Sequence, residues 1–466
     1  MATDFPAGLG ELLRCPVCGD GFVFTPVAAQ PLPDSVFGVL ACADHRYPVI
    51  DGIPVIRDGR VSVHDHMTGR AEVLGPTVAE LVKLVRSADP LAALVELLAF
   101  PPALPFGLET VPVARLPLTR GPGERASMRR RRALVRRRLG DLTDQTAQDW
   151  LELSYLRTRN VNRELYPYFL NRFGQPRYLA SLALVRALPP ADRPVLDLAC
   201  GFGHLMFHLG ARSQPHESVG VDRNFFQLWV ARRWVAPGAA FVCADANRPL
   251  PFVAEAFSAS LCTDAFHLFD DQPGCLAELQ RCAVGRTVVL DRVGNRLVEP
   301  HDGESERSPQ GYVDLLGGVP HRLIGETELT DGYLAGHGPA LAAPRPVAEF
   351  AEQKFLSLVS AADPTLFTDH GDFPEFPHAD GPLGINPIYR ISPDGADVML
   401  VFEFPSTWYA FENSRSLAYH APAIRLSRND FDALRRGQPT ERTDELVRKF
   451  ALLAMPEHYV RPPVTG

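Results

Sequence analysis

Glycines and acidic residues follow a series of short apolar segments in the middle of this chain. The segment 195–204 reads VLDLACGFGH, an apolar run that enters a Gly-x-Gly turn. Asp222 ends the next apolar run along the chain. Glycine permits positive φ and lets the backbone approach a ligand closely, and an acid at a strand end is placed to accept hydrogen bonds from ribose hydroxyls. The pattern indicates a nucleoside-binding site.

The acid at the end of the third apolar run fits the base of such a ligand. Asp245 is placed to accept a hydrogen bond from an adenine amino group, and the Ala246 amide to donate one to a ring nitrogen. A dinucleotide site is the competing interpretation, but it requires a third glycine to seat a pyrophosphate. Met206 occupies that position. A ligand without phosphate is therefore favoured over NAD.

The elements that must position these residues are alternating strands and helices. Apolar runs at 194–199, 218–221, 240–244, 258–263 and 287–291 predict strands, with helical patterns between them, for example at 225–234 and 273–282. This alternation is typical of a parallel sheet covered by helices on both faces. We expect an α/β domain over 191–344.

The segment 192–292 resembles class I S-adenosylmethionine (SAM)-dependent methyltransferases of the ubiquinone-biosynthesis type. Four segments match successive family motifs in order and at normal spacing: VLDLACGFGH, VGVDRNFFQLWVAR, CADANRPLPF, and LCTDAFHLFDD with LAELQR. The resemblance implies a Rossmann-like fold. Because SAM carries no phosphate, Met206 does not count against it. The one departure is Ala199, where many members carry glycine.

The resemblance also implies roles for the matching residues. Asp197, Gly201 and Gly203 would hold the methionine end of SAM, Asp222 the ribose, and Asp245 with Ala246 the adenine. Asp264 and His267 would lie beside the transferable methyl group. The neighbouring Ala199, Phe202 and Arg223 complete the predicted cofactor site. A general base is needed only if the acceptor is protonated and weakly acidic; the candidates are His267, Tyr312 and His321. A structural role for His267 is an equal alternative.

A second cluster of chemical interest lies near the N-terminus. Cys15-Pro-Val-Cys18 is followed, after 23 residues, by Cys42-Ala-Asp-His45. Three thiolates and an imidazole form a closed tetrahedral set suited to structural Zn²⁺, and a domain of this size with few apolar residues needs such a staple. The segment 46–55 resembles the small zinc-ribbon module of methyltransferase activator subunits. We expect a zinc ribbon over 1–60, with a metal-free ribbon as the alternative.

The composition excludes several classes of protein. The net charge is −8, so the chain is not a generally basic, nucleic-acid-coating protein. It has no apolar run of 18 residues, which predicts no transmembrane helix. The N-terminus lacks a signal-peptide pattern, and the cysteines form no disulfide-like framework. We therefore expect a cytoplasmic protein that does not associate with membranes.

The regions flanking the central domain are less informative. Residues 61–190 contain helical patterns at 78–86 and 91–99, a Pro/Gly-rich linker at 101–123, and an arginine run at 129–138. That run favours a solvated helix whose arginines pair with acids, and phosphate binding is the alternative. The aromatic group at 166–173 suggests either base stacking or a lid over the SAM site.

The C-terminal region, 345–466, is predicted to be α+β. Two apolar runs flank Ser392-Pro-Asp-Gly395, a strong hairpin signal. Ser427 with Asp430 predicts a capped helix. The hairpin either completes the central sheet after a long insertion or opens a separate unit.

Together these observations favour SAM-dependent methyl transfer to a small-molecule, natural-product or carrier-bound acceptor. An rRNA or tRNA methyltransferase is the first alternative, supported by the zinc module and the arginine run. A catalytically silent SAM-binding scaffold or activator subunit, with the ribbon docking a protein partner, is the second.

Overall fold

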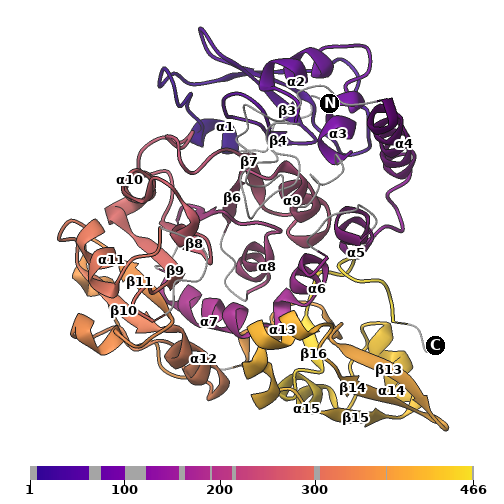
Figure 1. The fold of residues 1–466 in the computed structure, drawn as a ribbon, viewed down its shortest axis with the longest axis vertical. Coiled ribbons are helices and arrows are strands. Elements are labelled where there is room, and N and C mark those ends of the chain that lie inside the picture. The colour runs from indigo at the N-terminus through magenta and orange to yellow at the C-terminus, as the bar shows by residue number, and fades with distance from the viewer. Residues whose placement is uncertain are drawn as a thin grey trace.

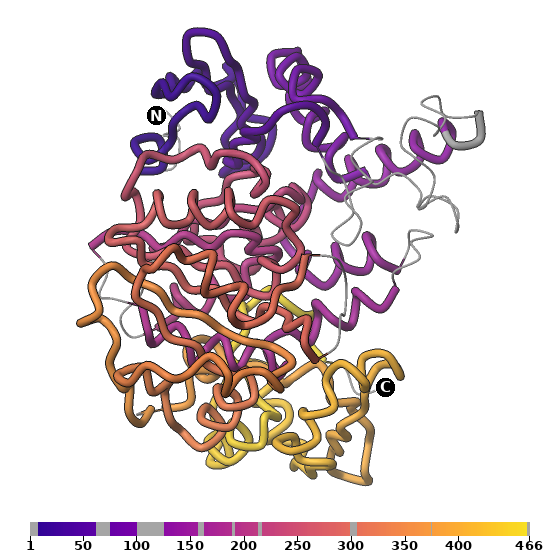
Figure 2. The backbone as a smooth tube through the Cα atoms, turned by 60° about the vertical axis from the view of Figure 1, so that its left-hand side comes forward, coloured from indigo at the N-terminus to yellow at the C-terminus, as the bar shows by residue number. Residues whose placement is uncertain are grey.

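The computed structural model describes residues 8–61, 75–99, 122–156, 163–188, 192–212, 217–298, 305–373 and 375–463. The predicted linker at 101–123 lies outside these ranges except for its last two residues. The N-terminal and C-terminal regions lie at opposite ends of the molecule, with the central sheet between them (Figures 1 and 2). No helix in the described ranges is long and apolar enough to cross a membrane.

A seven-stranded sheet forms the middle of the molecule, in the order β10-β11-β9-β8-β5-β6-β7. Its parallel strands are β5 (Val195–Leu198), β6 (Ser218–Asp222), β7 (Ala240–Cys243), β8 (Ala259–Thr263) and β9 (Val288–Gly294). Every residue of β5 and β9 is buried, as expected for parallel strands covered on both faces. The five predicted strands and the Rossmann-like α/β class are confirmed.

The sheet is mixed, because two antiparallel strands extend it beyond β9. These are β10 (His321–Gly325) and β11 (Phe355–Ser360), paired with each other and, through β11, with β9. Strand β11 lies past the expected domain boundary at residue 344, so the central sheet includes chain that was assigned to the C-terminal region. The short apolar sequence of β11 does not by itself indicate which sheet the strand joins.

Three helices follow strands of the sheet, and two of them begin at a polar capping side chain. Helix α8 (His204–Ala211) begins after the glycine turn, α9 (Phe225–Val230) is capped by Asn224, and α10 (Gln272–Cys282) is capped by Asp271. Each cap side chain accepts a backbone N–H of the first helical turn, which fixes where the helix begins. Helix α7 (Pro176–Leu184), which precedes β5, packs against α12 (Glu326–Leu334).

The N-terminal region contains a small antiparallel sheet, β1 (Val23–Pro26), β2 (Gly38–Ala41), β3 (Arg46–Ile50) and β4 (Ile53–Pro54). Helices α2 (Val78–Val85) and α3 (Leu91–Leu98) follow it, close to their predicted limits. The chain leaving β4 runs along the free edge of the central sheet. Val55 forms a parallel bridge with Cys243, and the Ile56 amide donates to the Cys243 carbonyl at 2.9 Å.

A buried carboxylate also joins these two units. Asp51 is fully buried and accepts hydrogen bonds from Trp229 Nε1 and Arg233 Nε, each at 2.7 Å. The Arg232 guanidinium lies 3.6 Å away. Both arginines and the tryptophan belong to the helical segment that follows β6. The small sheet is therefore a packed part of the central domain rather than a tethered appendage.

The C-terminal region has its own core and sheet. Strands β13 (Tyr389–Asp394), β14 (Asp397–Phe402) and β15 (Ala423–Leu426) form a separate three-stranded sheet, so the predicted hairpin opens its own unit and does not complete the central sheet. Helices α14 (Arg428–Arg435) and α15 (Thr443–Arg448) pack near it, and β12 (Leu383–Ile385) pairs with β16 (Leu452–Ala454). The chain then returns to the middle of the molecule, where Tyr459 contacts His204.

Replacing the buried Asp51 should weaken the packing of the small sheet against the central domain. We expect Asp51→Ala to lower the free energy of unfolding by about 3–5 kcal/mol, because it leaves Arg232 and Arg233 uncompensated in a partly buried position. Asp89→Ala is the matched control, because it removes an exposed pair with Arg136 and should cost less than about 1 kcal/mol. Urea unfolding measures both. Equal effects of the two substitutions would contradict the role assigned to Asp51.

Candidate functional site

The glycine turn after β5 is held open by backbone geometry. Ala199, Gly201 and Gly203 all have positive φ, and the Cys200 amide donates to the Val221 carbonyl at 3.1 Å. A side chain on Gly203 would also press on the Ala231 Cβ at 3.2 Å. Alanine adopts positive φ at a cost that glycine does not incur, so Ala199 is a strained position of the turn.

Met206 has a packing role in place of the glycine that a dinucleotide site requires. Its sulfur fills the space beside Gly220 of β6, where an added Cβ would lie only 2.5 Å from it. The helix after the turn therefore packs tightly on the sheet through a methionine.

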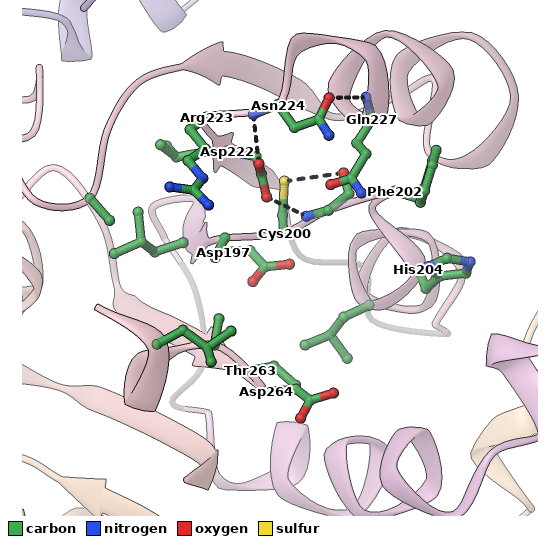
Figure 3. A pocket seen from close by; sticks show the side chains of 18 of the residues that line it. Asp197, Cys200, Phe202, His204, Asp222, Arg223, Asn224, Gln227, Thr263 and Asp264 are labelled. Atoms are coloured by element: carbon green, nitrogen blue, oxygen red, sulfur yellow. Dashed lines mark hydrogen bonds between the residues drawn. The ribbon is translucent and has the colours of Figure 1, made fainter. Parts of the chain in front are cut away.

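Asp222 is oriented by two backbone amides at the end of β6. Its carboxylate accepts the Gly201 N–H at 3.0 Å and the Asn224 N–H at 2.8 Å. Burial nevertheless raises the pKa of Asp222, although these bonds oppose the shift. Both contacts are drawn in Figure 3. The side chain is thus preset before any ligand arrives.

Asp197 lies deeper and has less support. It is 2 % exposed, and within the described residues no group donates a hydrogen bond to its carboxylate. Burial, with Asp222 nearby, raises the pKa of Asp197 to about 8. In Figure 3 it lies between Asp222 and Asp264. A ligand that brings positive charge to this position would stabilise the ionised form.

One cavity of about 220 Å³ joins these residues. All of the predicted cofactor residues except Gly203 line this cavity. They are Asp197, Ala199, Gly201, Phe202, Asp222, Arg223, Asp245, Ala246 and Asp264. The Asp245 carboxylate, just after β7, accepts the Asn247 N–H at 3.0 Å, and this bond fixes the orientation of the carboxylate. The predicted set therefore surrounds a single space, and Gly203 shapes the turn behind it.

The cavity also has walls outside the predicted set of cofactor residues, and one of them includes part of the aromatic group at 166–173, for which a lid over the SAM site was one of two predictions. Tyr168, Phe169 and Arg172 come from the segment before α7, where α6 (Leu165–Leu170) and a short turn end. Asn224 and Gln227 come from the start of α9. The aromatic group at 166–173 and the buried glutamine within an otherwise apolar helix were the available signals for these walls.

None of the three candidate bases is part of the described cavity wall, although His267 is close enough to Asp264 to help lower the pKa of that carboxyl. His267, Tyr312 and His321 are not among the described residues that line the cavity. The buried Tyr312 hydroxyl donates to the Gly294 carbonyl at 2.9 Å and accepts the Arg307 N–H. His321 is on β10, where its Nδ1 lies 3.1 Å from the Val319 carbonyl. These contacts support structural roles for Tyr312 and His321, and a catalytic role for any of the three stays a prediction.

Asp264, at the exit of β8, has the densest charged surroundings. Its φ is 57°, a left-handed conformation that is unusual for aspartate. Arg172, Arg177 and Arg292 all contact its carboxylate. Burial alone would raise the pKa of Asp264, but the three guanidinium groups hold it well below its usual range. Asp264 is therefore a fixed anion rather than a proton acceptor.

The four candidate metal ligands converge as predicted. The ligand atoms of Cys15, Cys18, Cys42 and His45 all lie within 4.8 Å of one another. Cys42 Sγ is 3.5 Å from Cys18 Sγ and 3.6 Å from His45 Nδ1. Ligands at tetrahedral Zn²⁺ are about 3.3–3.8 Å apart, given metal–ligand bonds of about 2.0–2.3 Å, so the four residues fit such an ion.

The arginine run forms the surface helix α4 (Pro122–Leu139). Arg132 pairs with Glu96 at 2.7 Å and Arg136 with Asp89 at 2.6 Å. Arg138 donates to the Asp149 carbonyl and lies over the Trp150 ring. Three of the arginines are thus engaged by neighbouring groups of the same chain.

Comparisons with known proteins agree with the central site. A family model described as a methyltransferase domain matches residues 195–284. A demethylmenaquinone methyltransferase of Thermus thermophilus is 38% identical over 130 residues, which are 26% of this chain and 59% of that protein. The chain thus spans under two thirds of this curated relative. The present chain carries a class I SAM-dependent methyltransferase domain at the matched residues.

Two solved structures with some similarity are a methyltransferase and a complex that contains one. A SAM-dependent methyltransferase of Thermotoga maritima has a TM-score of 0.31 at 19% identity, covering 44% of this chain and 97% of that one. A chain from the complex of the Haloferax volcanii Trm112 methyltransferase activator with a methyltransferase has a TM-score of 0.31 at 16% identity, covering 43% and 97%.

Proposed function

We propose that this protein is a SAM-dependent methyltransferase that acts on a small-molecule or carrier-bound acceptor. The observation that carries the proposal is the preset Asp222 carboxylate in a cavity that it shares with Asp197 and Asp245. The name of the Thermus relative, a quinone methyltransferase, supports a small acceptor. The internal pairing of Arg132 and Arg136 leaves the arginine helix a weak argument for RNA.

The residues would divide the cofactor between them. Asp222 would accept the ribose hydroxyls, Asp245 and the Ala246 amide would bind the adenine, and Asp197 would face the cationic methionine end. The reaction is an in-line displacement at the methyl carbon of a sulfonium, which is already a good leaving group. Positioning of the acceptor against that methyl can therefore supply several kcal/mol of the rate enhancement.

We further propose that Cys15, Cys18, Cys42 and His45 hold a structural Zn²⁺. The convergence of the four ligand atoms supports it. Such an ion would fix the loops that precede β1 and β3, and so the small sheet whose outgoing chain pairs with the edge of β7. The residues offer a closed set with no open position, which is the arrangement of structural rather than catalytic zinc.

Calorimetry with SAM tests the central proposal. We expect saturable binding to the wild type and at least a tenfold loss in Asp222→Ala, because two ribose hydrogen bonds disappear. Asp270→Ala is the matched control, since it removes an exposed carboxylate at the rim of the same cavity and should change the affinity less than about twofold. Absence of SAM binding in the wild type would overturn the proposal. Binding without transfer to any acceptor would favour a silent scaffold.

The raised pKa of Asp197 predicts a pH-dependent affinity. Below its pKa of about 8 the free protein carries a protonated Asp197. If the cationic end of SAM selects the ionised form, binding releases a proton, and the affinity rises by up to about tenfold per pH unit between pH 6 and 7.5. Asp197→Asn should bind more weakly and without this slope. A wild-type affinity that is flat over this range would contradict the assignment of Asp197.

Metal analysis tests the zinc site. Protein purified without added metal should contain about one zinc per chain, and Cys42→Ala should lose it and unfold at a lower temperature. Cys200→Ala, which changes a cysteine outside the cluster, should keep the metal. Wild-type protein with less than about 0.2 equivalents, together with a normally folded Cys42→Ala, would show a metal-free ribbon.

A further inference from the structure

Three arginines gather around Asp264, at one end of the cavity. Arg172 comes from the turn after α6, Arg177 from α7 and Arg292 from β9, and all three reach the same carboxylate. Two further acids balance the outer side of the cluster. Glu412, at the end of α13 (Thr407–Glu412), pairs with Arg177 at 3.1 Å, and Glu326 of α12 pairs with Arg292 at 2.8 Å.

Arg172 differs from the other two arginines. It lines the cavity, whereas Arg177 and Arg292 do not. It has no second carboxylate among the described residues, and its contacts with Asp264 are long, 3.3 and 3.4 Å. Charge-assisted hydrogen bonds of this type are usually about 2.7–2.9 Å. Arg172 is therefore the guanidinium best able to turn toward an incoming anion.

A phenolic oxygen already contacts two of these guanidinium groups. The Tyr168 hydroxyl accepts from Arg172 at 2.7 Å and from Arg177 at 3.3 Å, and it donates to Asp264 at 3.1 Å. Both guanidinium groups also lie within 5.3 Å of the centre of its ring. The arrangement of donors is thus one that fits an aromatic or enolic oxygen.

Two titratable groups in this part of the cavity are unsuited to act as a general base. The three arginines hold the pKa of Asp264 too low for it to take a proton at neutral pH. His204 lines the cavity, but burial lowers its pKa to about 3, and its Nε2 lies 2.9 Å from the Tyr459 hydroxyl. An acceptor that needed a general base would find none of suitable strength among these groups.

We propose that Arg172, with the Tyr168 hydroxyl, binds the acceptor as an oxyanion, the ionised hydroxyl of a phenol or enol. Positive charge in this wall lowers the pKa of the bound hydroxyl, so the nucleophile forms without a general base. The inference rests on the proposed methyltransferase function and specifies its acceptor class. Tyr168 and Arg172 contribute the hydrogen bonds, and Asp264 with Arg177 and Arg292 positions Arg172.

The step is balanced in atoms and charge. The acceptor hydroxyl loses its proton to solvent as it binds, and the oxyanion attacks the methyl carbon. The carbon–sulfur bond breaks with its electron pair going to sulfur, which yields a neutral methyl ether and neutral S-adenosylhomocysteine. The negative charge of the oxyanion and the positive charge of the sulfonium are both lost in this step.

A spectroscopic probe tests the inference without knowledge of the acceptor. The full chain, saturated with S-adenosylhomocysteine, is titrated with para-nitrophenol, whose ionised form is coloured. We expect the pKa of the bound phenol to fall by about one unit or more in the wild type and to return most of the way to its free value in Arg172→Gln. Tyr168→Phe, which removes only a hydroxyl, should give a smaller shift than the wild type.

Two control variants make the outcome decisive. Arg390→Gln changes an exposed arginine paired with Glu403 and should leave the shift unchanged, and Arg172→Lys should retain part of it. A probe that does not bind the wild type, or binds with an unshifted pKa, would overturn the inference. Loss of SAM binding by the wild type would instead remove the proposed function, so the two failures are distinct.

A last comparison separates the acceptor from the cofactor's own carboxylate. Binding of SAM and of 5′-methylthioadenosine, which lacks the methionine carboxylate and ammonium groups, is measured in the wild type and in Arg172→Gln. We expect the substitution to change both affinities by less than about threefold. A loss confined to SAM would show that Arg172 holds the methionine carboxylate, and the acceptor assignment would be wrong.

Discussion

The site depends on one constraint, the burial of several carboxylates near the carboxyl ends of the parallel strands. Parallel strands end side by side, so Asp197, Asp222 and Asp264 are brought to a single cavity. Removing charged groups from water is costly, and like charges add to that cost. The chain meets the problem in three ways. Asp222 receives two backbone amides, Asp264 receives three arginines, and Asp197 keeps a raised pKa of about 8.

These solutions depend on parts of the chain outside the matched domain. Arg172 and Arg177 precede β5, and Glu412, which balances Arg177, belongs to the C-terminal region. At the other end of the cavity, Arg57 donates to the Arg223 carbonyl beside Asp222. The added regions thus contact both ends of the site. This gives a physical reason why segments distant in sequence pack so closely around one domain.

The part of the site that the sequence predicted is the part with local order. At 195–204, 218–222 and 240–246 a strand is followed within a few residues by a turn or an acid. The cofactor-binding end of the cavity could therefore be predicted from the sequence alone. The four candidate metal ligands are equally local, as two pairs with fixed spacing. The cluster at Asp264 has no such pattern, because residues 172, 177, 292 and 412 meet only after α7, β9 and α13 have packed. The strand at 355–360 was missed for the same reason, since its partner β9 lies some 60 residues earlier.

The two ends of the cavity are therefore electrostatically different. Near β5 and β6 the walls present carboxylates. One of them, Asp197, accepts no hydrogen bond from the described part of the chain and suits a cation. Near β8 they present a guanidinium whose bonds to its own carboxylate are long. A cationic methyl donor and an anionic acceptor would each be drawn to opposite walls and would meet between them. Since the reaction cancels both charges, such a site attracts the charged reactants more strongly than the neutral methyl ether and thioether.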